Sequence, residues 1–184
     1  MTTRYVIRQR ITMVVNRYEV WTADEQWNPV APVAFAQQKR GRLREEVPFY
    51  ADDSRQQVLF TLKARNVLDV RSVVDVRDLD GTVIGTFHKD FGQSLLISTW
   101  HVEQPGLPVA TGREASTLYA VARRIGFDLL PYDFVFTAAD GRPVMTVVRK
   151  WGVRDTYRVE IADDRFDHRV LQSVAVALDA LQNR

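Results

Sequence analysis

The residues best suited to binding chemistry form a run of cations in the first quarter of the chain. The run Lys39-Arg40-Gly41-Arg42-Leu43-Arg44 holds four cations, and Glu45 and Glu46 follow it. A guanidinium offers paired N–H donors that match phosphate or carboxylate oxygens. The run predicts one of two structures. Either Lys39, Arg40, Arg42 and Arg44 form an anion site, or a solvated turn is partly neutralised by its own glutamates.

A second basic group lies near the carboxyl end, where Arg149, Lys150 and Arg154 flank Trp151. Tryptophan between cations is suited to a membrane interface, although an aromatic side chain in a β protein commonly belongs to the core. We therefore take Arg149, Lys150 and Arg154 as further candidate anion ligands. Whether the two groups converge depends on the tertiary structure.

Catalytic and metal-binding patterns are not found in the sequence. The run Asp78-Leu79-Asp80-Gly81 resembles part of a calcium loop, but Val76 and Phe87 occupy the first and last ligand positions. The chain has no cysteine, and its three histidines are not at metal-ligand spacing. Ser98, His101 and Glu103 lack a nucleophile elbow. We expect no enzymatic activity, no metal site and no cofactor.

Composition favours one intracellular domain spanning residues 1–184. Apolar residues make up 46% of the chain, and the net charge of +2 is too small to drive wholesale binding to nucleic acid. The apolar run Val174 to Leu178 is far shorter than the roughly 20 residues of a spanning helix. We expect no transmembrane segment and no secretion signal. We predict that the protein is cytoplasmic, and one version of this prediction places it peripherally on a membrane.

Most of the chain reads as short β-branched and aromatic segments separated by turn residues, which is typical of an all-β barrel or sandwich. Asp80-Gly81 and Asp140-Gly141 predict two tight hairpins 60 residues apart. The similarity indicates either a duplicated hairpin or the common physics of Asp-Gly turns. Trp27 to Pro32 and Gln104 to Gly112 are expected to be loops.

Two segments have helical spacing. Glu114 to Ile125 predicts a short amphipathic helix that ends at Gly126. Asp167 is a candidate N-cap for a second helix, whose apolar residues from Val170 to Leu181 surround nearly its whole circumference. Such a helix must be buried on most sides. The sequence therefore predicts a mainly β fold, a closed antiparallel barrel of about twelve strands around the hydrophobic C-terminal helix, with one further short helix.

Four features together resemble the tubby-like superfamily, which includes LURP-one-related proteins and phospholipid scramblases. They are the segment Ala36-Gln37-Gln38-Lys39, the run from Val76 to Gly85, the hairpin around Asp140-Gly141 and the closing helix from Asp167 to Leu181. The resemblance implies a barrel around a C-terminal helix and an association with phospholipid or phosphoinositide. It assigns no binding residue to a position of this chain.

The expected function is a non-enzymatic binding or scaffold module. In one form it binds acidic phospholipid headgroups peripherally through the basic loop, and in another it binds a protein partner. The alternative is a nucleic-acid-binding or regulatory protein-interaction domain, in which basic loops contact phosphate and exposed tryptophans stack on bases. The balanced charge makes nucleic acid the less favoured partner.

Overall fold

The protein is described by a computed structural model covering residues 2–11, 15–39, 46–65, 73–90, 99–114, 133–150 and 156–182. Within these ranges the chain forms twelve strands followed by a helix. The elements are β1 (Thr3–Ile11), β2 (Val15–Ala23), β3 (Pro29–Lys39), β4 (Val47–Tyr50), β5 (Val58–Ala64), β6 (Val74–Arg77), β7 (Val83–Asp90), β8 (Thr99–Glu103), β9 (Ala110–Glu114), β10 (Asp133–Ala138), β11 (Pro143–Lys150), β12 (Thr156–Ile161) and α2 (His168–Gln182).

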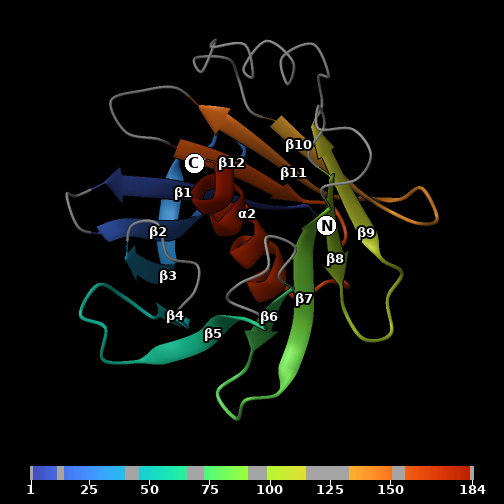
Figure 1. Cartoon of the computed structure of the whole chain (residues 1–184). Helices are drawn as coiled ribbons and strands as arrows, with labels where there is room; N and C mark the ends of the chain where they lie inside the picture. The colour runs from blue at the N-terminus through green and yellow to red at the C-terminus, as the bar shows by residue number, and fades with distance from the viewer. Residues whose placement is uncertain are drawn as a thin grey trace.

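The strands form a closed antiparallel barrel, as the sequence predicts. Each strand pairs with the next along the chain, and β12 pairs with β1 to close the sheet. Every strand of the barrel therefore has a paired neighbour on both sides. In Figure 1, α2 runs through the middle of this ring of strands. The apolar residues of α2 are therefore enclosed by the strands of the barrel.

The start of α2 and its burial both follow the prediction. The carbonyl of Asp167 accepts the N–H of Val170 at 3.0 Å, and its Oδ1 accepts the N–H of Arg169 at 2.9 Å. Asp167 is thus the N-cap. Seven apolar side chains of the helix are at most 3% exposed: Val170, Leu171, Val174, Ala175, Val176, Ala177 and Leu178. The helix fills the space that twelve strands would otherwise leave open.

The prediction of a loop from Gln104 to Gly112 is wrong for its last residues. Ala110 to Gly112 belong to β9, and Glu114, where a helix was expected to begin, ends that strand. The remaining residues of that expected helix, 115–125, lie outside the described ranges. The sequence of β9 is Ala-Thr-Gly-Arg-Glu, which has little β propensity of its own. It forms a strand because β8 and β10 pair with it on both sides.

The expected loop from Trp27 to Pro32 is also partly wrong, because β3 begins at Pro29. Proline lacks the N–H that a strand ladder uses, so proline inside a strand normally marks an irregularity. Pro29 pairs with Ala23 and Pro32 pairs with Trp21, and the register shifts beside each pair. Bulges at these points let the ladder tolerate both prolines.

Three hairpin turns share one backbone geometry. In the β6–β7 turn, the N–H of Asp78 donates to the carbonyl of Thr82, and the N–H of Gly81 donates to that of Asp78. The β10–β11 turn repeats both bonds 60 residues later, with the register shifting at matching positions. The β2–β3 turn, residues 24–28, has the same two bonds. Duplication remains a hypothesis, but the similarity extends beyond the Asp-Gly pairs.

Candidate functional site

Alternation along the strands separates the inside of the barrel from its outside. On β1, Tyr5 and Ile7 belong to the core, so the alternate residues lie on the outer face. The same alternation applies to β2, β11 and β12, which adjoin β1 in the order β11, β12, β1, β2. These four strands carry six outer cations, which we name the basic wall: Arg4, Arg8, Arg10, Arg17, Lys150 and Arg158.

Strand pairing brings these cations together from distant parts of the sequence. Arg10 lies directly opposite Arg17. Arg8 and Lys150 both pair with Thr156, from its two sides. Since neighbouring strands are about 4.8 Å apart, the wall extends over about 14 Å from Lys150 to Arg17. An extended anionic surface could contact several of these side chains at once.

Two carboxylates lie among the six cations. Glu160 Oε2 accepts a hydrogen bond from Arg4 Nε at 3.0 Å, and Glu19 Oε1 lies 3.0 Å from Arg10 Nε. The described outer positions of the wall therefore keep an excess of positive charge. Arg10 and Arg17 are both exposed, and like charges directly opposite each other on a sheet are destabilising. An anion bound between them would relieve that repulsion.

The structure describes three of the seven predicted anion ligands, Lys39, Arg149 and Lys150. Lys150 is exposed on the outside of β11, whereas Arg149 points inward, with its Cζ 6.0 Å from the Tyr157 ring. Lys39 is the last residue of β3 and pairs with Val15, two residues before Arg17 on β2. The other predicted ligands, Arg40, Arg42, Arg44 and Arg154, lie outside the described residues. Of the predicted ligands that the structure describes, Lys150 lies within the wall.

Sequence reasoning overlooked the other five cations of the wall. On β1, Arg4, Arg8 and Arg10 are separated by even numbers of positions, which is the signal of a strand with one charged face. That signal could have been read from the sequence. The positions of Arg17 and Arg158 beside these arginines could not be read from the sequence, because they depend on which strands pair.

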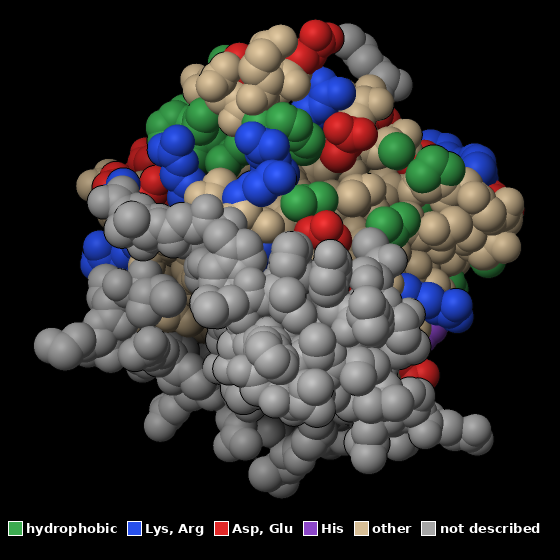
Figure 2. Space-filling model, turned by 90° about the horizontal axis from the view of Figure 1, so that it is seen from above, with side chains coloured by type: hydrophobic (Ala, Val, Ile, Leu, Met, Phe, Trp, Pro, Cys, Tyr) green, Lys and Arg blue, Asp and Glu red, His purple; other side chains and the backbone are tan. Residues whose placement is uncertain are grey.

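Aromatic side chains lie at one end of the wall, beside the β2–β3 turn (residues 24–28). We call this the turn end of the wall. The Cζ atoms of Arg4 and Arg158 lie 5.8 Å and 5.2 Å from the centre of the Trp27 ring. Val6 is 3% exposed although it is not part of the barrel core, and its partner across the pair is Trp21. Figure 2 views the molecule from above β10, β11 and β12 of Figure 1, and Lys and Arg side chains lie beside apolar ones there.

Two histidines lie on another part of the outer surface. His88 on β7 is opposite His101 on β8, and their rings stack with centroids 5.0 Å apart. His101 Nδ1 is 3.4 Å from the hydroxyl of Thr111, and its Nε2 is 4.0 Å from the Asp90 carboxylate. Burial lowers the pKa of His101, and the neighbouring His88 lowers that pKa further. His101 therefore adds little positive charge at neutral pH.

A hydrogen-bonded chain of tyrosine, histidine and aspartate lies at the start of α2. The hydroxyl of Tyr5 is 2.8 Å from His168 Nδ1, and His168 Nε2 is 3.3 Å from Asp164. Such a chain could in principle activate a nucleophile. However, Tyr5 is only 6% exposed and its burial raises the pKa of the hydroxyl. These hydrogen bonds instead link β1 to the start of α2.

Metal and membrane features were also sought in the described part of the chain. No three His, Asp or Glu side chains within it are arranged to hold a metal ion. No helix within it has the length and apolarity needed to cross a bilayer.

Comparison with known proteins identifies the family. The family model described as LURP-one-related matches residues 33–179, from β3 into α2. No curated protein matches the chain. The match covers most of the barrel and the central helix but excludes β1 and β2, which carry four of the six cations of the basic wall. The chain belongs to the LURP-one-related family of tubby-like β-barrels.

Proposed function

We propose that the protein is a non-enzymatic binding module that docks peripherally on membranes containing acidic phospholipids, and that the basic wall is its contact surface. The observation that carries this proposal is the gathering of six cations against two carboxylates on four adjacent strands. A tubby-like barrel is compatible with such a module. The cytoplasmic leaflet supplies the negative surface that such a wall requires.

The chemistry of the wall favours phosphate groups. Exposed guanidinium groups can grip phosphate oxygens with two N–H donors each. Each Lys or Arg close to an anionic bilayer contributes about 1 kcal/mol to binding. Nucleic acid is the weaker alternative, because Glu19 and Glu160 interrupt the cations, so the four described strands of the wall carry no continuous basic track.

Vesicle sedimentation tests the proposal. Wild-type protein is mixed with phosphatidylcholine vesicles, with or without phosphatidylserine, at low and raised salt. We expect binding only when phosphatidylserine is present, and weaker binding at raised salt, because salt screens exposed charges within about 10 Å at 0.1 M. The double variant Arg17→Ala/Lys150→Ala should bind about 30-fold more weakly, which corresponds to about 2 kcal/mol.

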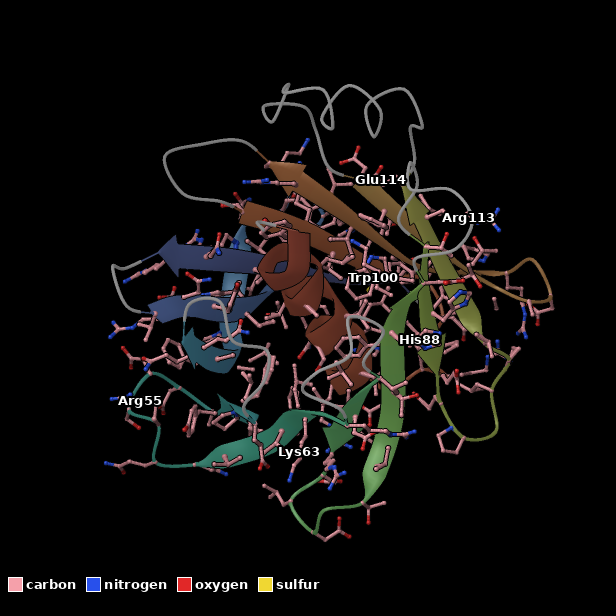
Figure 3. The ribbon with its side chains drawn as sticks, viewed as in Figure 1. Arg55, Lys63, His88, Trp100, Arg113 and Glu114 are labelled. Atoms are coloured by element: carbon pink, nitrogen blue, oxygen red, sulfur yellow. The ribbon has the colours of Figure 1, made fainter. Side chains whose placement is uncertain are left out.

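A matched control removes two exposed cations elsewhere. Lys63 on β5 and Arg113 on β9 lie away from the four strands of the wall (Figure 3). Lys63→Ala/Arg113→Ala changes the net charge by the same amount, so it should leave vesicle binding nearly unchanged. Equal weakening by both double variants would mean that net charge, and not the wall, governs binding. Failure of the wild-type protein to bind phosphatidylserine vesicles would remove the membrane proposal.

A further inference from the structure

Trp27 has a backbone conformation that bulky residues avoid. Its φ is 67°, in the left-handed region where a Cβ crowds the following carbonyl. The equivalent positions of the two other turns with this geometry are glycines, Gly81 at φ 85° and Gly141 at φ 84°. A tryptophan thus occupies a position for which glycine is the natural choice. An observed outlier of this kind points to a role for the side chain.

The indole is not needed to form the turn. Asp24 Oδ1 accepts the N–H groups of Gln26 at 2.9 Å and Asn28 at 2.8 Å, and Asp24 Oδ2 accepts the side-chain amide of Asn28. The two backbone hydrogen bonds of this turn are the same as those of the glycine-containing turns. These bonds fix the turn without help from the ring, so glycine at position 27 should be compatible with it.

The position of the indole indicates what it is for. It is partly exposed, and it lies at the turn end of the basic wall beside the guanidinium groups of Arg4 and Arg158. An indole combines an apolar body with one N–H donor, and such side chains prefer the boundary between hydrocarbon and headgroups. Arginines at the same place would meet the phosphate groups while the ring enters the layer just beneath them.

We propose that Trp27 is an aromatic anchor that inserts at the bilayer interface next to the arginines of the basic wall. This inference rests on the membrane docking proposed above, and it makes the turn end of the wall the part that enters the lipid. The partner is a phospholipid bilayer whose acidic headgroups face the wall. Attraction between the acidic headgroups and the cations of the wall would bring Trp27 to the membrane surface.

The test compares Trp27→Gly with wild-type protein in thermal melting and in vesicle sedimentation with phosphatidylcholine–phosphatidylserine vesicles. We expect an unchanged or slightly raised melting temperature, because glycine relieves the left-handed strain. We expect vesicle affinity to fall about tenfold, as for the loss of one buried aromatic group. The control is Leu79→Ala, which removes an apolar side chain that is 68% exposed on another turn and should leave affinity unchanged.

A second measurement reports directly on the position of the indole. Brominated phosphatidylcholine in the same vesicles should quench wild-type tryptophan emission, and this quenching should be lost in Trp27→Phe. Unchanged vesicle affinity in a folded Trp27→Gly variant would overturn the anchor while leaving the docking proposal intact. Persistence of the quenching in Trp27→Phe would overturn it as well. If wild-type protein binds no vesicles, the docking proposal itself fails.

Discussion

Gly112 on β9 should be among the least replaceable residues of the barrel. A Cβ built on it would lie 2.3 Å from Phe136 Cε1 and 2.4 Å from Phe136 Cζ, whereas carbon atoms pack best at about 3.5–4.0 Å. The ring would have to move by more than an ångström. Phe136 is fully buried, and its centroid is 6.3 Å from that of Phe134, so it has little room to move. Overpacking of this kind costs about 1–3 kcal/mol, and we expect Gly112→Ala to reach about 3.

Urea unfolding measures this effect. With a slope of about 1–3 kcal/mol per molar, a loss of about 3 kcal/mol lowers the midpoint by about 1–3 M. Gly81→Ala is the control, because nothing lies within 4 Å of its Cβ and only its φ of 85° opposes the substitution. That control should cost about 1–2 kcal/mol. Shrinking the ring with Phe136→Leu should recover part of the Gly112→Ala loss, giving a favourable coupling between the two sites.

Two results would refute the reasoning about Gly112. One is a Gly112→Ala loss no larger than that of Gly81→Ala. The other is strict additivity of Gly112→Ala and Phe136→Leu, since residues in steric contact should couple.

Three further perturbations test the rest of the fold. Leu178 is 1% exposed inside the barrel, so Leu178→Ala should cost about 2–5 kcal/mol in urea unfolding; truncation before Asp167 should give insoluble protein, and a soluble truncated chain with an unchanged melt would contradict a central role for α2. Arg165 holds the pKa of Asp163 at about 2, below its ordinary 3.8. This contribution to stability is present above pH 3.8 and is lost as pH falls toward 2, so Asp163→Asn should flatten the pH dependence of unfolding in that window. Asp75, 2% exposed, accepts hydrogen bonds from Arg65 at 2.7 Å and Arg77 at 2.8 Å; Asp75→Ala should cost about 1–3 kcal/mol, and an unshifted urea midpoint would argue against it.

The overall architecture could be predicted because it depends on local patterns. The apolar residues of α2 surround the helix, and only a buried position satisfies such a helix. The Asp-Gly pairs predicted two hairpins. The positive φ angles of Gly81 and Gly141 explain why glycine occurs at these positions. Period-two segments supplied most of the strands. Each of these signals lies within a few neighbouring residues.

β9 escaped prediction because nothing in its own sequence demands a strand. Gly112 is small because the ring of Phe136 already occupies the interior beside it. The reason for the residue lies in a strand more than twenty positions later. Only tertiary packing supplies it.

The sequence by itself therefore determined a β-barrel with a central helix and a supply of cations, because hydrophobic periodicity and turn chemistry are local properties. Only the tertiary structure decided which cations share a surface. Lys150 faces outward and its neighbour Arg149 faces inward, since successive strand residues point to opposite faces. Arg10 lies opposite Arg17 through the register of the β1–β2 hairpin, and Val6 lies opposite Arg158 where β1 pairs with β12 from the other end of the chain. A charge pattern across a closed sheet is fixed by register, and register is set by the whole barrel.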